Sequence, residues 1–346
     1  MSALSALVLG GIALLSAVAT RAARSYALSK QLIDTPNHRS SHAVPIPRGG
    51  GISLALAWFV AVAAFARPTL SPLTAALFFG GLLISLLGWL ADQGRASVRF
   101  RLSLQFMAVT ALVLAIGAPE SVSFGLAALP LGPLAIPVVI TGIVWIVNLY
   151  NFMDGVDGIA ATQAVVAGAA MGAILLVGGA PELALLSFAL AAAGVGFIRW
   201  NWPPARVFMG DVGSGLLGFA FGAIALAGSQ QASVALPLLL LPLGPFIADA
   251  TGTLVRRAIR GERVYLAHRR HLYQRLAQAG WSHKRISAVT GAIAFALSGV
   301  AFWGAGGAGR TTLALGLGVG GLLLVGAILS RIAVDFDDAP GSKFPG

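Results

Sequence analysis

The chain of 346 residues contains no cysteine and few charged residues. Without cysteine it forms neither disulfides nor thiolate metal sites. Charged residues make up 10% of the sequence, whereas hydrophobic residues make up 57% and the mean hydropathy is +0.86. A composition with so little charge excludes an ordinary soluble domain. It predicts an all-α polytopic membrane protein.

Apolar runs long enough to cross about 30 Å of hydrocarbon recur along the whole chain. The expected spans are residues 2–20, 50–66, 72–91, 103–118, 131–149, 159–178, 182–198, 212–229, 233–250, 287–306 and 311–332. We interpret the first run as an anchor and not as a signal peptide, because no positive charge precedes it. We expect a single domain, residues 1–332, built as a bundle of about eleven transmembrane helices, and then a polar cytoplasmic tail, residues 333–346.

Acidic residues are scarcer than basic ones, 12 against 23. With the N-terminus placed outside, 21 of the 23 Lys and Arg residues fall in cytoplasmic segments, and only Arg67 and Arg310 do not. The positive-inside rule therefore predicts a periplasmic N-terminus and a cytoplasmic C-terminus. The basic cluster between Arg256 and Arg285 suits anionic lipid headgroups or a phosphorylated substrate. Nucleic acid is excluded as a partner, because no nucleic-acid fold fits between the spans.

The most polar stretch inside this apolar sequence is NLYNFMDGVDGIA, from Asn148 to Ala160. It places Asn148, Asn151, Asp154 and Asp157 at the end of a span, where each polar group has to be hydrated or bound. A helix start with Asp157 as its N-cap would explain only one of the two acids. The stretch therefore favours a binding site for a hydrophilic ligand.

Two earlier segments carry polar side chains on the same predicted face. DTPNHRSSHAVPIPRGGG, residues 34–51, offers His42 and Arg48 to phosphate oxygens, and the alternative is a polar loop that only orients the protein. GWLADQGRASVRFRLSLQF, residues 88–106, ends a span with Asp92. An acid at such a position is commonly just solvated, so this segment alone favours no function.

Two later segments complete the face. NWPPARVFMGDVGSGLLGF, residues 201–219, starts a helix whose free N–H groups suit a pyrophosphate, with Asp211 either as an oxygen ligand for Mg²⁺ or as part of a helix cap. AHRRHLYQRL, residues 267–276, sets His268 and His271 at i and i+3, which places them on one helix face. Zinc fits poorly, because no HExxH motif and no third ligand are near. Phosphate or headgroup contact fits better, and a solvated interfacial helix is the alternative.

The segments NHRSSHAVPIPRGGG, NLYNFMDGVDGIA, FMGDVGSGLLG and HRRHLYQRL, in this order and at these spacings, resemble the polyprenyl-phosphate N-acetylhexosamine-1-phosphate transferases, glycosyltransferase family 4. The likeness covers residues 30–280 and is nearest to the O-antigen-initiating branch. It implies transfer of a sugar phosphate from a UDP-N-acetylhexosamine to undecaprenyl phosphate, with release of UMP. It also implies Mg²⁺, or Mn²⁺ in its place, and an active site at the cytoplasmic face of the bacterial inner membrane, among membrane lipids. A homodimer is compatible with it.

The resemblance also implies roles for individual residues. Asp211 and Asp92 are the expected metal ligands, and with His268 and His271 they are the expected catalytic residues. The expected substrate-binding residues are His42, Arg48, Asn148, Asn151, Asp154, Asp157, Phe208, which would lie against the uracil, and Arg269.

One position departs from the family pattern. Where the family has two consecutive acids, this chain has Ala91 followed by Asp92. Because a phosphate monoester is already largely ionised near neutral pH, the acceptor needs only a weak base, and we expect an active enzyme. Two alternatives stay open: a non-catalytic relative that binds the same ligands, and a transporter or flippase for an anionic lipid-linked substrate. The sequence lacks clear internal repeats and midplane charges, which are typical of transporters.

Overall fold

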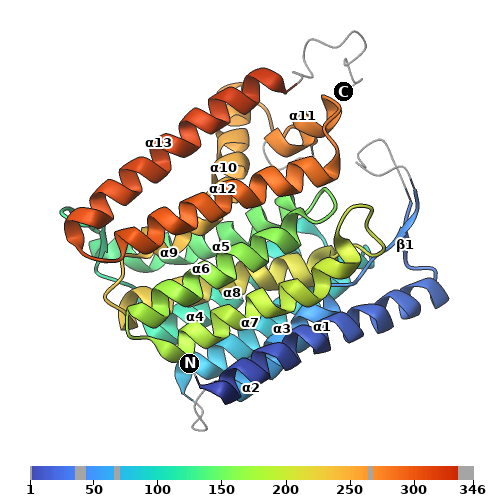
Figure 1. The fold of residues 1–346 in the computed structure, drawn as a ribbon, viewed down its shortest axis with the longest axis horizontal. Coiled ribbons are helices and arrows are strands. Elements are labelled where there is room, and N and C mark those ends of the chain that lie inside the picture. Colours follow the sequence, from blue (N-terminus) through green and yellow to red (C-terminus); the bar gives the residue numbers. More distant parts are fainter. Residues whose placement is uncertain (1, 36–43, 66–70, 264–267, 334–346) are drawn as a thin grey trace.

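The computed structural model describes residues 2–35, 44–65, 71–263 and 268–333. These ranges form a bundle of long helices with two small antiparallel hairpins, β1–β2 and β3–β4 (Figure 1). In chain order the elements are α1 (Ala3–Ser29), β1 (Ile33–Asp34), β2 (Ile46–Pro47), α2 (Ile52–Phe65), α3 (Pro72–Asp92), α4 (Val98–Ile116), β3 (Ser121–Ser123), β4 (Ala128–Pro130), η1 (Gly132–Leu134), α5 (Ala135–Met153), α6 (Ile159–Val177), α7 (Pro181–Asn201), α8 (Gly210–Gln231), α9 (Leu236–Leu240), η2 (Leu241–Leu243), α10 (Gly244–Ile259), α11 (Leu272–Gln278), α12 (His283–Gly304) and α13 (Ala308–Ile332).

Ten helical segments among the described residues are long and apolar enough to cross a membrane, and α2 is a shorter apolar helix of 14 residues. One of the ten, Leu236–Ile259, is broken into α9, η2 and α10, because Pro242 and Pro245 lack the N–H that a continuous helix needs. Each expected span coincides with one of these helices. The prediction of an all-α polytopic membrane protein is confirmed, while the number of crossings, the side of each terminus and the single domain stay predictions. Beyond Ala333 the predicted tail lies outside the described residues.

Several helices continue beyond the apolar runs from which they were predicted. α1 ends at Ser29 instead of residue 20, α4 begins at Val98 instead of residue 103, and α10 ends at Ile259 instead of residue 250. Membrane thickness limits the apolar run but not the helix, which continues into the polar interface. In α10 the last turn carries Arg256 and Arg257, where the negative end of the helix dipole favours cations.

α8 is the central helix of the bundle. Of the 18-residue apolar stretch of α8, 94% is buried inside the bundle. The corresponding share in α13 is 11%, because its large side chains face outward. Small residues let the neighbours of α8 approach closely. A Cβ added at Gly218 would lie 2.6 Å from the Cα of Val147 on α5, and one added at Gly80 on α3 would lie 2.5 Å from the ring of Phe219. α3 and α5 therefore pack directly against α8.

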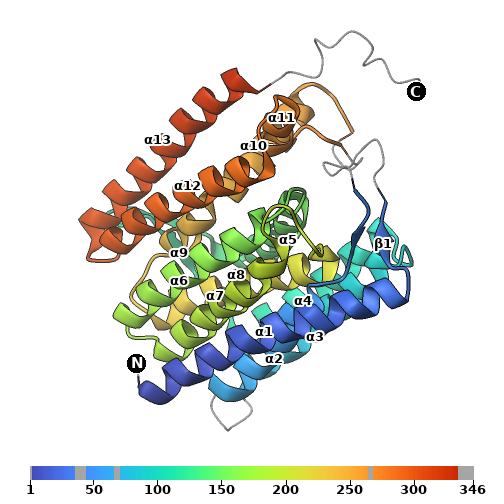
Figure 2. The ribbon, with the colours of Figure 1, turned by 45° about the vertical axis from the view of Figure 1, so that its right-hand side comes forward.

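The loops that meet at the first turn of α8 lie at one end of the bundle, together with β1 and α11 (Figures 1 and 2). β1 pairs with β2 so that Ile33 lies opposite Pro47. One residue later Arg48 forms a parallel bridge with Phe208, just before α8 begins. The hairpin thereby brings the segment after residue 44 onto the start of the central helix.

Candidate active site

The first turn of α8 is held by an acid from another helix. Asp92, the last residue of α3, accepts the N–H of Asp211 with its two carboxylate oxygens, at 3.0 and 3.1 Å. α3 comes this close because Gly88 has no side chain: a Cβ there would lie 2.5 Å from the backbone N of Val212. A carboxylate is stabilised at this position by the helix dipole and by N–H groups that have no partner within the helix. The expectation of a free N–H for pyrophosphate is therefore wrong at Asp211.

Arg48 joins Asp92 to Asp211. Its Nε lies 2.9 Å from Asp92 Oδ1, and its Nη2 lies 3.1 Å from Asp211 Oδ1. The backbone around it is fixed, because Phe208 donates its N–H to the Pro47 carbonyl at 2.9 Å. A predicted substrate-binding residue thus lies between the two predicted metal ligands, and Phe208 is its neighbour across the bridge.

Two further side chains contact the carboxylate of Asp211. Arg101 Nη2 lies 2.8 Å from Asp211 Oδ2. Asn151 donates from Nδ2 to Asp211 Oδ1 at 3.0 Å and to Ser214 Oγ at 2.9 Å. No role for Arg101 was predicted from the sequence, although one signal was available: a cation near the N-terminus of a helix is disfavoured by the helix dipole unless an anion lies nearby.

The acids around Arg48 suit a divalent cation whose coordination is completed by oxygen atoms of a substrate. Within the described ranges no group of three or more His, Cys, Asp or Glu side chains is placed to hold a metal ion alone. Asp92 and Asp211 nevertheless converge on one cation, the guanidinium of Arg48. Mg²⁺ commonly uses one or two carboxylates together with substrate phosphates. The two acids therefore fit the predicted Mg²⁺, with phosphate oxygens as its other ligands.

Asp154, the C-cap of α5, belongs to the same electrostatic environment. Burial raises the pKa of its carboxyl well above its usual range. The nearby charge of Arg48 opposes this rise in pKa, and Asp211 and Asp92 add to it. A cation bound among these acids would favour the ionised form of Asp154.

Asp157 faces away from this cluster. Its Oδ2 accepts the N–H of Ala205 at 2.9 Å, its Oδ1 lies 3.2 Å from His283 Nδ1, and its carbonyl accepts the hydroxyl of Ser287 at 2.7 Å. Its interpretation as the N-cap of α6 is wrong, because Gly158 is the N-cap and the carboxylate binds the α7–α8 loop instead. Asp157 therefore joins three separate parts of the chain, and His283 is a partner that the sequence did not reveal.

Asn148 lies one turn before Asn151 and links two helices. Its side chain donates to Gln105 Oε1 on α4 and to the carbonyl of Val144, each at 2.7 Å. These bonds satisfy the polar group inside the bundle, where an unpaired amide would be costly. The side chain of Asn148 therefore links α5 to α4 one turn before Asn151.

α11 covers the stretch from Asn148 to Ala160. Tyr273 donates its hydroxyl to the carbonyl of Phe152 at 3.0 Å, and the ring of His271 stacks on the ring of Phe152 with centroids 6.1 Å apart. A Cβ at Gly155 would collide with the Tyr273 hydroxyl. The glycine therefore permits the contact with α11.

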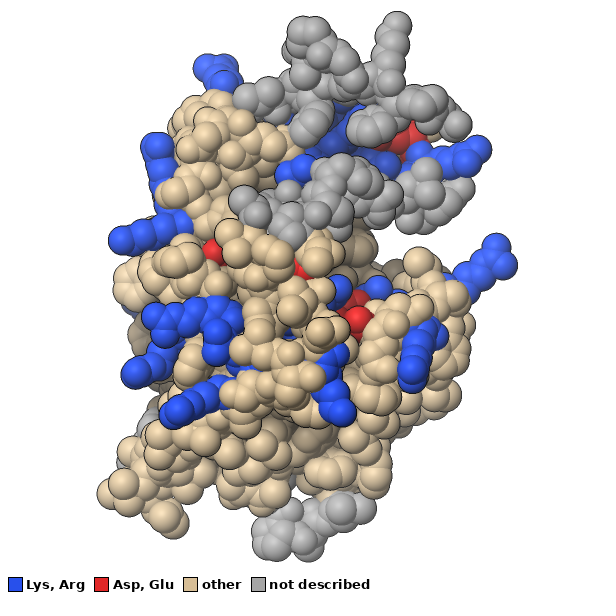
Figure 3. Space-filling view, turned by 90° about the vertical axis from the view of Figure 1, so that its right-hand side faces the viewer, with Lys and Arg blue, Asp and Glu red and all other residues tan. Residues whose placement is uncertain are grey.

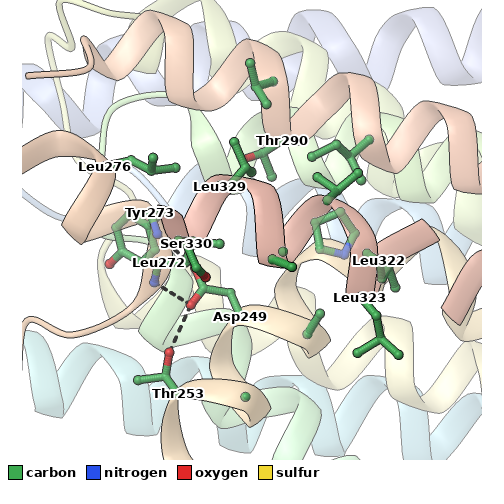
Figure 4. A pocket seen from close by; sticks show the side chains of 18 of the residues that line it. Asp249, Thr253, Leu272, Tyr273, Leu276, Thr290, Leu322, Leu323, Leu329 and Ser330 are labelled. Atoms are coloured by element: carbon green, nitrogen blue, oxygen red, sulfur yellow. Dashed lines mark hydrogen bonds between the residues drawn. The ribbon is translucent and has the colours of Figure 1, made fainter. Parts of the chain in front are cut away.

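Asp249 on α10 determines where α11 begins. Its carboxylate accepts the N–H groups of Leu272 and Tyr273 at 2.7 and 3.0 Å and the hydroxyl of Thr253 at 3.2 Å (Figure 4). His271 Nδ1 lies 3.5 Å from the same carboxylate. These bonds satisfy the first N–H groups of α11, so the helix begins at Leu272. The only sequence signal for this role was an acid inside an apolar run.

The two predicted catalytic histidines precede α11, so the expectation that they share a helix face is wrong. Their rings are still close, with centroids 4.8 Å apart. Burial, and after it the nearby charges of His271, Arg257 and Arg270, lower the pKa of His268 to about 4. His268 is therefore neutral near pH 7. Arg269 lies between the two histidines, and the predicted residue His42 lies outside the described residues.

Basic side chains surround the acids at this end of the bundle. Figure 3 shows Lys and Arg side chains spread over this face and acidic side chains in a recess between them. Such an arrangement attracts anionic ligands toward the end of the bundle where these acids lie.

Comparison with known proteins assigns the family. Residues 74–229 match the model of glycosyl transferase family 4. The chain is 30% identical over 273 residues to a protein of Bacillus subtilis named as a probable undecaprenyl-phosphate N-acetylglucosaminyl 1-phosphate transferase, covering 77% of this chain and 75% of that protein. The chain belongs to glycosyl transferase family 4. The resemblance of its motifs to the polyprenyl-phosphate N-acetylhexosamine-1-phosphate transferases is thereby confirmed, and so is the prediction of an enzyme.

Two further relatives align over three quarters or more of the chain. A decaprenyl-phosphate N-acetylglucosaminephosphotransferase of Mycolicibacterium smegmatis is 29% identical over 352 residues, covering 89% of this chain and 84% of that protein. An undecaprenyl-phosphate alpha-N-acetylglucosaminyl 1-phosphate transferase of Escherichia coli K12 is 29% identical over 279 residues, with 76% and 74% covered. The matched family region runs from α3 to α8 and includes Asp92, Arg101, Asn151 and Asp211. The roles of individual residues stay predictions.

Proposed function

We propose that this protein transfers an N-acetylhexosamine-1-phosphate from a UDP-sugar to undecaprenyl phosphate. An oxygen of the acceptor phosphate forms a bond to the β-phosphorus, the bond between that phosphorus and the bridging oxygen breaks, and UMP leaves. The products are undecaprenyl-pyrophosphate-sugar and UMP. The observation that carries the proposal is the convergence of Asp92, Arg48, Arg101 and Asn151 on Asp211 in a chain of this family.

The residues around Asp211 meet the main requirement of this reaction, which is to bring two anions together. Arg48 and Arg101 supply positive charge, and their pairing with Asp92 and Asp211 fixes where that charge lies. Asp211 and Asp92 would hold Mg²⁺, which, when bound, offsets phosphate charge and polarises the phosphoryl oxygens. Asn151 orients Asp211, because its amide bonds both Asp211 and Ser214.

The donor and acceptor sides follow from the surrounding loops. In the proposal, the loop with Asn151, Asp154 and Asp157 receives the nucleotide, and Phe208 lies against the uracil. Asp157 shapes this loop through Ala205 and His283. The neutral His268 and the neighbouring His271 complete the substrate site from the segment before α11 as hydrogen-bonding groups.

The cellular setting is also part of the proposal. The site would face the cytoplasm at the inner membrane, since the basic residues gather at its end of the bundle. The product would initiate O-antigen or another cell-surface polysaccharide. The three relatives described above are named for N-acetylglucosamine, which makes UDP-N-acetylglucosamine the first donor to test.

The test measures UMP released by purified protein with undecaprenyl phosphate, Mg²⁺ and a panel of UDP-N-acetylhexosamines. We expect release that needs both the acceptor and one donor of the panel. Asp211→Asn protein, purified in the same way, is the control for contaminating activity. Absence of UMP with every donor would refute the reaction for this chain.

A further inference from the structure

A cavity lies beside α11, and neither Asp92 nor Asp211 lines it. It has a volume of about 440 Å³ and is lined by residues of α10, α11, α12 and α13, together with Met153 of α5 and Trp281 (Figure 4). Cavities of about 300–1,000 Å³ are typical of small-molecule sites. Val319 and Leu323 of α13 line it while 53% and 70% of their surfaces stay exposed. The cavity therefore opens to the outside of the bundle, where a membrane protein meets lipid.

α11 and Met153, the last residue of α5, form the side of the cavity next to the loop between α5 and α6. Leu272, Tyr273 and Leu276 line the cavity, and Tyr273 is fixed to the Phe152 carbonyl at 3.0 Å. Among the described residues, Arg48, Arg101 and Asn151 contact Asp211 or Asp92 with their side chains, and none of the three lines the cavity. The cavity is therefore lined by a different set of residues from the one that surrounds Asp211.

The charges of the cavity favour an anion at its mouth. Among its described lining residues, the charged ones are Asp249 and Arg256. The carboxylate of Asp249 is occupied by the N–H groups of α11 and the hydroxyl of Thr253. Arg256, in the last turn of α10, is exposed. The cavity thus combines an apolar interior with a cation at the end where the other basic residues gather.

We propose that this cavity binds one acyl chain of an anionic phospholipid, with the lipid phosphate on Arg256. Lipid tails are as apolar as the cavity lining, so the chain gains little by leaving the bilayer, and selectivity comes from the headgroup charge. The acyl chain packs on Leu272 and Leu276 and thereby supports the helix that holds His271 over the site. In this proposal the lipid is not a substrate, because neither Asp211 nor the side chains that contact it line the cavity.

Two variants test the cavity and its charge. Gly326 lines the cavity, and a Cβ there would meet nothing within 4 Å, so Gly326→Leu fills the space without a backbone clash. Its control is Gly320→Leu on the same helix, at an open position that does not line the cavity. Arg256→Gln removes the charge, and Arg331→Gln, an exposed residue of α13 outside the cavity lining, is its control.

The measurements are native mass spectrometry of bound lipid and Tm in neutral detergent, with phosphatidylglycerol or phosphatidylcholine added. Wild-type protein is expected to retain phosphatidylglycerol in preference and to show a higher Tm with it, because a ligand that binds only the folded state stabilises it. Arg256→Gln should weaken retention about fivefold, as expected for one basic residue at a headgroup. Gly326→Leu should abolish retention and the Tm shift, and both controls should behave as wild type.

Three results would overturn the proposal: equal retention of the two lipids, unchanged retention in Gly326→Leu protein, or displacement of phosphatidylglycerol by an equimolar amount of undecaprenyl phosphate. The last result would assign the cavity to the acceptor chain. Because neither measurement uses turnover, failure here is distinct from failure of the proposed reaction.

Discussion

Asp249→Asn tests whether α11 is held over the site by a single carboxylate. Asparagine retains one acceptor oxygen, which can keep the N–H of Leu272, now bonded at 2.7 Å. Its NH₂ group then faces the N–H of Tyr273, now bonded at 3.0 Å, and leaves that donor without a partner. The variant therefore loses one charge-assisted hydrogen bond and the negative charge at the start of α11.

The two losses set the expected size of the effect. A hydrogen bond to a charged group contributes about 1.5–3 kcal/mol, and a charge at a helix terminus about 0.3–1 kcal/mol. The docked state of α11 should thus lose about 2–4 kcal/mol, which corresponds to about 30- to 1,000-fold at 1.36 kcal/mol for each factor of ten. Because His271 and Tyr273 contact Phe152, undocking of α11 should also lower turnover.

The assay is amide hydrogen exchange of residues 272–278 in detergent, alongside UMP release. Exchange of these amides should accelerate up to the limit set by local unfolding, while exchange in α8 stays unchanged. Thr253→Val is the matched control, because it removes only a neutral hydroxyl at 3.2 Å, with an expected cost of about 1 kcal/mol or less. Wild-type exchange and wild-type turnover in the Asp249→Asn protein would refute the argument.

Three further predictions concern the site itself. Arg48→Gln should lower kcat/KM about 10²–10³-fold, the usual loss for one preorganised donor, while Arg95→Gln, at an exposed arginine beyond α3, should not; equal effects would mean that only net charge matters. EDTA should abolish turnover and added Mg²⁺ should restore it in wild type but not in Asp211→Asn protein, and Mg²⁺-independent turnover would remove the metal from the proposal. His283→Ala should raise KM for the UDP-sugar about tenfold with little change in kcat, because it frees the loop around Asp157, and His283→Asn should recover part of the loss; a change in kcat alone would contradict this positioning role.

The helices were predictable because the bilayer imposes a simple rule on the sequence. Every crossing needs a long apolar run, so each expected span coincides with a helix. Helix ends were less predictable, as α10 shows. Its last turn lies beyond the apolar run and is stabilised by Arg256 and Arg257 at the negative end of the dipole. Hydropathy does not report such interactions.

The site was predictable as a set of residues and not as a set of contacts. Asp211, Asn151 and Arg48 were expected near one another, because their motifs fall on one face of the membrane. That Asp92 would bind the N–H of Asp211 depends on how closely α3 packs on α8 at Gly88, 123 positions before Asp211. The start of α11 likewise depends on Asp249, which is 23 positions from Leu272. Such non-local contacts leave no local pattern in the sequence.

Ala91→Asp tests whether the missing family acid limits this chain. Residues i and i+1 of a helix do not share a face, so an acid at position 91 would not replace Asp92 at the start of α8. It would add a separate negative charge beside the cluster that already contains Asp92, Asp154 and Asp211. The acceptor phosphate is largely ionised near neutral pH and needs little help from a base.

We therefore expect Ala91→Asp to change kcat by less than about tenfold, below the usual contribution of a general base, about 10²–10⁴-fold. The measurement is the rate of UMP release at saturating donor and acceptor, with Ala91→Asn as the uncharged control. A rise of about 10²-fold or more in the aspartate variant alone would mean that the acceptor does require a base and that the native chain lacks it. Asp92 would then serve only as the cap of α8, and the chain would be a slow member of its family.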